Sequence, residues 1–436
     1  MKQRIFGAAL AAMLAAPTVH AQDPLPAGVA LATFDTVWAR INRTFYDTAF
    51  LNTRWVALRD SLRPVAAKAT TNDQLRGTLQ VMLGSIGTSH FGIITRESSP
   101  ALNADEAIAS ANPGSIGLQL RAIGTELFAS RVENGSPAWR AGVRPGMSIK
   151  TIGNTSVATT MQQVTAIENP DVRKQTMMAV VMQANARLNR APGDSIKLDF
   201  GRGPVFVTAE KAPGQMSKFG NLPPMSTRVE AYERRVNGKR IGVIAFSVWM
   251  PVAVAQIDSA VDRFRDADGI IFDVRGNPGG VAGMVGGVAG HVVDSQYVVG
   301  TLIQRGATLS LRANPRRVST QAERVAPYAG PVAVLIDPLS ASASEFFAAG
   351  LQGWGRARVF GETSAGASVP ALMGRLPNGD VLLHAIADHK DSKGRRVEGV
   401  GVIPDEVTPL NAASLAAGRD DALDAALRWA AAQTNK

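Results

Sequence analysis

Three serines stand at alternate positions between two predicted elements, and they are Ser340, Ser342 and Ser344. The apolar run 332–336 before them predicts a buried strand, and the Ala, Phe and Leu residues of 344–351 predict a helix after them. A serine at a strand-to-helix turn is well placed for nucleophilic chemistry, because backbone N–H groups at a helix start stabilise a developing oxyanion. The same serines can also simply cap the helix.

Two glycine-rich turns offer a base and further backbone donors. His90 follows Ser89 on the first turn, which lets a side chain project into a cleft, although a surface position is the alternative. Gly279 and Gly280 lie on the second turn, after a buried strand predicted over 269–275, and allow the backbone to approach a ligand closely. The second turn has neither a G-K-S/T ending nor a GxGxxG pattern, which argues against nucleotide binding.

The composition is that of a globular protein of two or three domains. The chain has 436 residues, of which 45% are hydrophobic and 19% are charged. It contains no cysteine, which excludes a thiol nucleophile, disulfides and a Cys-based zinc site. The net charge is +10, but the basic residues are interleaved with acidic ones, so binding of nucleic acid is not expected.

The first 21 residues have the pattern of a signal peptide. A basic start is followed by the apolar stretch 5–16 and by small residues that predict cleavage after Ala21. The apolar stretch is too short to span a membrane, and no later stretch is long enough. We therefore expect an exported, soluble protein, periplasmic or secreted, without a lipid anchor because no cysteine is present at the cleavage site.

The remaining chain divides into three parts. Residues 22–105 predict helices, with an N-cap cluster near residue 71, and residues 98–112 have the composition of a linker. From residue 222 on, strands 240–246 and 269–275 enclose a helix at 254–264, which predicts a mainly parallel α/β core. Later in this core, Asn378-Gly379 predicts a hairpin. Asp388 and His389 are interpreted as a solvated pair in a polar loop.

Residues 113–208 resemble a PDZ domain, on the basis of the Gly-Ser-Pro-Ala-Trp-Arg-Ala-Gly-Val-Arg-Pro-Gly run that begins at Gly135. In that family an extended peptide adds to a sheet edge, and backbone N–H groups hold its terminal carboxylate. The resemblance implies that a helix within 177–188 borders the peptide groove, and that the carboxylate loop consists of Ser115, Ile116, Gly117 and Leu118. A packing module that binds no peptide is the alternative.

The motifs together resemble the S41 peptidases, the family of tail-specific proteases and the tricorn core. The resemblance covers the chain after the signal peptide and rests on the Ser-His turn, the PDZ-like module, residues 273–280, the Ser-Ala-Ser-Glu stretch, Gly361-Glu362-Thr363 and residues 398–405. It implies a multidomain α+β protein with an N-terminal helical domain at 22–105, a PDZ-like domain at 113–208 and a crotonase- or ClpP-like α/β peptidase core at 222–436.

The resemblance also implies the site. Residues 364–367 lack the lysine of the tail-specific branch, so the sequence is similar to the tricorn branch with its Ser/His/Ser/Glu tetrad. By position, Ser342 is the nucleophile, His90 its base, and Ser89 and Glu398 the partners that orient the imidazole. The N–H groups of Ala343 and of Gly279 or Gly280 would form the oxyanion hole, and no metal or cofactor would be needed. Glu398 can alternatively pair with Arg395 or Arg396.

These implications predict a serine endopeptidase that cleaves peptides or unfolded proteins, with the PDZ-like module selecting substrate. Three alternatives remain open. The first is a protein that binds apolar ligands, as the retinoid-binding modules of this fold do. The second is a Ser-Lys peptidase that uses Lys390 or Lys393. The third is an envelope scaffold that acts only through its PDZ-like module. The sequence does not determine the number of subunits.

Overall fold

The computed structural model describes residues 24–97, 114–219 and 225–433. The predicted signal peptide, residues 1–21, and the predicted linker, residues 98–112, lie outside the described residues. None of the helices that the structure describes is long and apolar enough to cross a membrane.

A six-stranded sheet forms the centre of the C-terminal core, in the order β13-β14-β15-β18-β19-β23. All neighbouring pairs are parallel except β13 and β14, which confirms the predicted parallel α/β core. The strand predicted over 332–336 is β18 (Val332–Ile336). The other strands are β13 (Val229–Val236), β14 (Lys239–Phe246), β15 (Gly269–Asp273), β19 (Arg358–Gly361) and β23 (Glu406–Val407).

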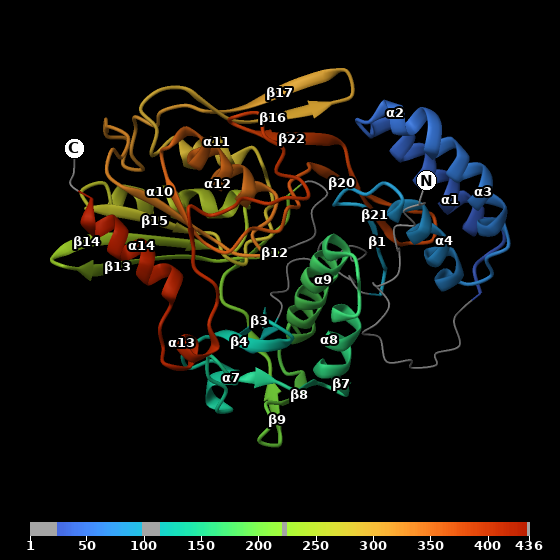
Figure 1. Cartoon of the computed structure of the whole chain (residues 1–436), viewed down its shortest axis with the longest axis horizontal. Helices are drawn as coiled ribbons and strands as arrows, with labels where there is room; N and C mark the ends of the chain where they lie inside the picture. The colour runs from blue at the N-terminus through green and yellow to red at the C-terminus, as the bar shows by residue number, and fades with distance from the viewer. Residues whose placement is uncertain (1–23, 98–113, 220–224, 434–436) are drawn as a thin grey trace.

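Helices cover both faces of this sheet because its buried strands are apolar on both sides. Ile270, Phe272 and Val334 face one layer of helices, which consists of α10 (Val254–Arg263), α11 (Met284–Ala289) and α12 (Ala343–Trp354). Ile271 and Leu335 alternate with them and face α14 (Asp421–Ala432) on the opposite side (Figure 1). Shorter elements of the core are η2 (Pro251–Ala253) and α13 (Ala412–Ala416).

The N-terminal helices share one hydrophobic core with a hairpin from the far end of the chain. Strand β1 (Gly92–Ile94) pairs with β21 (Val381–Ala385), which also pairs with β20 (Ala371–Arg375). Val369 and Leu382 are buried among the helices, so this part of the protein is built from both ends of the chain. Its helices are α1 (Val29–Thr44), α2 (Thr48–Phe50), η1 (Leu51–Trp55), α3 (Val56–Ala67) and α4 (Asn72–Gly84).

The middle module, defined as residues 114–211, has its own apolar core and lies below the core sheet in Figure 1. Its longest helix, α9 (Pro170–Leu188), packs against strand β3 (Leu118–Ile123), which is the edge strand of the sheet β3-β4-β5. The other elements are β2 (Gly114–Ser115), β4 (Glu126–Val132), α7 (Pro137–Arg140), β5 (Ser148–Ile149), β6 (Thr151–Ile152), β7 (Thr155–Ser156), α8 (Val157–Thr165), β8 (Ser195–Asp199), β9 (Pro204–Thr208) and β10 (Glu210–Lys211).

Two small sheets complete the fold. The first consists of β11 (Gln215–Ser217) and β12 (Met225–Thr227), which follow the middle module. The second has the order β17-β16-β22 and covers the helices α11 and α12 at the top of Figure 1. Its strands are β16 (Tyr297–Gln304), β17 (Ala307–Ala313) and β22 (Ala387–Asp391).

Candidate active site

Ser342 lies at the turn between β18 and α12, directly before the first residue of the helix. Its backbone has φ 52° and ψ −117°, a conformation that a residue with a side chain rarely adopts. Such strain persists only where the surroundings impose it, and here the Ser342 N–H donates to the Ala367 carbonyl at 2.8 Å. Ser342 is partly exposed, whereas Ser340 and Ser344 are fully buried and bonded within the core. Of the three candidate serines, Ser342 alone is accessible.

The buried carboxylate of Glu345 organises this turn. It accepts bonds from the Ser364 hydroxyl at 2.5 Å and from the backbone N–H groups of Gly366, Ala367 and Ser342 at 2.8, 3.0 and 3.1 Å. Burial raises the pKa of Glu345 to about 7, although these four donors act in the opposite direction. In the sequence, Glu345 is noticeable only as the last residue of the Ser-Ala-Ser-Glu stretch. A glutamate three residues after a serine at a helix start is also the pattern of an ordinary capping box, so its further contacts gave no separate signal.

We expect Glu345→Gln to lower kcat about a hundredfold, because an amide NH₂ group would face backbone donors that now bond a carboxylate oxygen and would displace the turn. The rate of peptide hydrolysis and the melting temperature should be measured together. Glu406→Gln is a matched control, because Glu406 lies on the edge strand β23 and pairs only with Arg358 on the surface. Unchanged kcat in a folded Glu345→Gln protein would contradict this role for Glu345.

His90, Ser89 and Glu398 form a hydrogen-bonded relay. His90 Nδ1 lies 2.7 Å from Ser89 Oγ, and Ser89 Oγ donates to Glu398 Oε2 at 3.0 Å. The Ser89 N–H donates to the other carboxylate oxygen at 2.7 Å. Because the hydroxyl gives its single proton to Glu398, Nδ1 of His90 must be the donor to Ser89, which leaves Nε2 unprotonated. This is the tautomer that a general base requires.

The positions of these residues follow from the local structure. His90 has a φ of 59° on the turn between α4 and β1, and this left-handed conformation is more common for His than for most residues. Glu398 is buried, although carboxylates seldom are. Arg395 and Arg396 pair with Asp391 and Asp388, respectively, so neither arginine is the partner of Glu398.

Burial lowers the pKa of His90 to about 4. The imidazole is therefore neutral at neutral pH and can accept a proton. The bonds to Ser89 and, through it, to Glu398 would stabilise the cation once it forms.

The segment 366–368 joins the nucleophile turn to the relay. Its Ala367 carbonyl accepts the bond from the Ser342 N–H, and the next residue, Ser368, donates its N–H to Glu398 Oε2 at 2.8 Å. Two consecutive residues, Ala367 and Ser368, therefore contact Ser342 and the carboxylate of the relay, respectively. This path of hydrogen bonds links the turn that carries Ser342 to the carboxylate that Ser89 contacts.

The three predicted oxyanion donors differ in whether their backbone N–H groups are available to a substrate. Gly279 packs so tightly that a Cβ built on it would lie 2.6 Å from the Ser342 Cβ, but its N–H already donates to Asn277 Oδ1 at 2.9 Å. Ala343 is the first residue of α12, so its N–H has no acceptor within the helix. Gly280 is partly exposed. Ala343 and Gly280 therefore fit the role better than Gly279.

Other candidate residues lie elsewhere. The prediction that Asp388 and His389 form a solvated pair is wrong, because both lie on β22, where His389 is fully buried against Phe346 and Asp388 pairs with Arg396. Lys390 lies on the same strand, and Lys393 is exposed in the following turn. Ser115, Ile116, Gly117 and Leu118 lie in the middle module, at β2 and the start of β3. Among the described residues, no group of three His, Asp or Glu side chains could hold a metal ion.

Comparison with protein-family models gives two matches. Residues 240–408 match the family described as "Peptidase family S41", and residues 31–84 match the "Tricorn protease C1 domain". The first match contains Ser342, Glu345 and Glu398, and the second covers the helices that precede Ser89 and His90.

Comparison with individual proteins agrees with the family matches. A "Carboxyl-terminal-processing protease" of Synechocystis is 22% identical over 85% of this chain and 79% of its own length. A chloroplastic "Carboxyl-terminal-processing peptidase 3" of Arabidopsis thaliana is 24% identical over 86% of this chain and 68% of its own length. Among solved structures, the "Photosystem II D1 C-terminal processing protease" has the same fold, with a TM-score of 0.58 and 18% identity over 92% of this chain and 96% of that one.

Proposed function

Since the chain is a serine peptidase of family S41, we propose that it hydrolyses internal peptide bonds with Ser342 as nucleophile and His90 as general base. The observation that carries this proposal is the bonded path from Ser342 through Ala367 and Ser368 to Glu398, Ser89 and His90. The substrates are peptides or unfolded protein segments, and the tetrad is that of the tricorn branch.

In the proposed reaction, the Ser342 hydroxyl attacks the carbonyl carbon of the scissile bond while His90 Nε2 accepts its proton. The negative charge on the carbonyl oxygen is stabilised by the N–H groups of Ala343 and Gly280. His90 then gives the proton to the leaving amine, and an acyl-enzyme remains on Ser342. Water, deprotonated by the same nitrogen, hydrolyses the acyl-enzyme and restores the serine.

A fluorophosphonate probe tests this assignment directly. We expect the folded protein to be labelled at Ser342, located by mass spectrometry, and we expect labelling to be lost in the His90→Asn variant. Asn tolerates the left-handed backbone at position 90, so loss of labelling would reflect loss of the base rather than misfolding. Labelling of another serine would refute the assignment of Ser342.

The pH profile gives a second test. Since burial lowers the pKa of His90 to about 4, the base stays unprotonated as the pH falls through neutrality. We therefore expect the titration of His90 to leave kcat/KM level from about pH 7 to pH 5 and to lower it only as the pH falls through the pKa of about 4. Protonation of Glu345, whose pKa burial raises to about 7, should add an earlier decline centred near pH 7, because its carboxylate holds the turn that carries Ser342. A decline near pH 7 that persists in Glu345→Gln would contradict the low pKa of His90.

Two further parts of the proposal concern the middle module and export. The PDZ-like module is proposed to take part in peptide hydrolysis because it contacts the segment that carries Glu398. Lys174 Nζ, on α9, lies 3.4 Å from the carbonyl oxygen of Val400, two residues after Glu398. Selection of substrates by their free C-terminus would require an open edge at β3. Export is proposed from the pattern of residues 1–21, which has the basic start, apolar stretch and small residues of a signal peptide.

A further inference from the structure

The outer edge of β3 is already bonded to the helix that faces it. The Leu120 N–H donates to Asn185 Oδ1 at 2.8 Å, and Asn185 Nδ2 donates to the Leu120 carbonyl at 3.0 Å. Asn185 Nδ2 is also 2.8 Å from the Val181 carbonyl, which fixes its orientation on α9. A peptide that adds to this edge as a strand would need the same two backbone groups of Leu120. The Asn185 amide occupies the place of a peptide backbone.

The loop that would hold a terminal carboxylate is also occupied. The Gly117 N–H donates to Ser115 Oγ at 3.0 Å and is therefore not free for a ligand. The carbonyls of Ile116 and Gly117 accept bonds from the N–H groups of Ala138 and Glu133. These bonds tie the loop to the segment that contains α7.

An apolar side chain from the catalytic core packs against the middle module. Leu339, three residues before Ser342, packs against the hydrophobic cluster of the middle module. Leu118 of β3 and Met177 of α9, which border the expected groove, pack against the same cluster, and Val181 of α9 belongs to it. The nucleophile turn thus supplies the kind of side chain that a bound peptide would place there.

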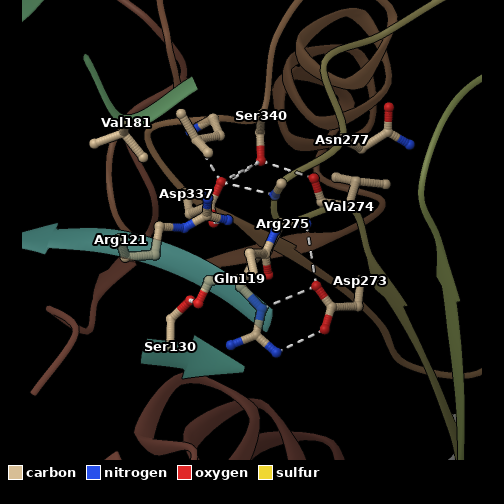
Figure 2. Close-up of polar contacts among 12 residues, drawn as sticks. Gln119, Arg121, Ser130, Val181, Asp273, Val274, Arg275, Asn277, Asp337 and Ser340 are labelled. Carbon is tan, nitrogen blue, oxygen red and sulfur yellow. Dashed lines mark hydrogen bonds and ion pairs between the residues drawn. The ribbon is translucent and has the colours of Figure 1, made fainter. Parts of the chain in front are cut away.

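A buried ion pair holds the two parts together. Arg121 points from β3 to Asp337 Oδ2, as Figure 2 shows. The other carboxylate oxygen of Asp337 accepts the N–H groups of Gly276 and Leu339 at 2.9 and 3.0 Å. Asp337 thereby connects the glycine turn that precedes Gly279 with the turn that precedes Ser342. Arg121 is therefore connected to both turns through the Asp337 carboxylate.

We propose that the chain itself fills the groove of the PDZ-like module, so that the module positions the nucleophile turn and does not select substrates by their C-terminus. Asn185 replaces the peptide backbone, Leu339 replaces the peptide side chain, and Arg121 is a positioning residue for the turn that carries Ser342. This inference rests on the proposed function, in which Ser342 is the nucleophile.

Peptide binding tests the closed groove without catalysis. In a protein that carries Ser342→Ala, we expect fluorescent peptides with free apolar C-termini to bind with a Kd weaker than about 1 mM. Adding Asn185→Ala should free the edge of β3 and strengthen binding at least about tenfold, with amidated peptides as a control for the carboxylate. Asn189→Ala, just beyond the end of the same helix, is the matched variant and should change nothing. Saturable micromolar binding of these peptides to the protein that retains Asn185 would overturn the proposal.

Kinetics test the positioning role of Arg121. We expect Arg121→Met to lower kcat and the rate of fluorophosphonate labelling at least about tenfold, with little change in KM, and Arg121→Lys to restore part of the loss. Rates are calculated per folded molecule, so a merely structural role would lower the melting temperature but not the labelling rate. That result would overturn the positioning role. If the unsubstituted protein is not labelled at Ser342, the proposed function fails, but the binding measurement still decides whether the groove is closed.

Discussion

Replacing Ser342 by alanine is expected to lower kcat for a peptide substrate by about a hundred-thousandfold to a millionfold, because no other group can form the acyl-enzyme. The fold should persist. The bonds that hold this turn use the N–H of residue 342 and the carboxylate of Glu345, and alanine retains that N–H. Since alanine also has a Cβ, the unusual backbone conformation is equally strained in both proteins.

The measurement is the rate of hydrolysis of a quenched fluorescent peptide, together with thermal unfolding of both proteins. Ser295→Ala is the matched control, because Ser295 is exposed and its hydroxyl contacts only its neighbour Asp294. Undiminished turnover by Ser342→Ala would exclude Ser342 as the nucleophile. It would return the question to the alternatives of a scaffold or of a protein that binds apolar ligands.

Removing the base should be nearly as damaging. We expect His90→Asn to lower kcat by a similar factor, and we expect the double variant with Ser342→Ala to be no slower than either single variant, because members of one catalytic unit are not additive. Asparagine is preferred to alanine here because it tolerates the φ of 59° at this position. A further loss of rate in the double variant would mean that His90 acts apart from Ser342, and a normal rate in His90→Asn would require another base, such as a lysine.

The fold was predictable where one local pattern determines one element. The apolar run 332–336 is fully buried between two helical layers, so its continuous hydrophobicity had only one interpretation. The hairpin around Asn378-Gly379 and the helix after Thr71 follow from turn and capping preferences that act over a few residues. These features depend little on the rest of the chain.

Tertiary contacts decided the features that the sequence did not show. Residues 387–391 are polar enough for a loop, but β22 pairs with β16 and His389 packs on Phe346, which makes the segment a buried strand. The alternating residues 115–120 are compatible with one continuous strand, but β2 ends at Ser115 and β3 begins at Leu118, because Gly117 between them has a φ of 68°. Asn185 has no local signature, because its role arises only when α9 packs on β3.

The candidate site likewise combines features that local sequence patterns predict with features that depend on tertiary contacts. The residue types of the tetrad could be inferred from the order of the motifs. The contacts that Ala367 and Ser368 make with Ser342 and Glu398 had no signal in the sequence, where this segment shows only that the lysine of the tail-specific branch is missing.

The shared core of the N-terminal helices and the C-terminal hairpin also governs when the enzyme can become active during its synthesis. Ser89 bonds to a carboxylate 309 residues later in the chain. When a nascent chain already includes His90 and Ser342, it still lacks Glu398. The segment 366–368 is also synthesised only after Ser342, shortly before Glu398. If Ser342 and His90 act together as proposed, the serine therefore remains without an oriented base until almost the whole polypeptide has been translated.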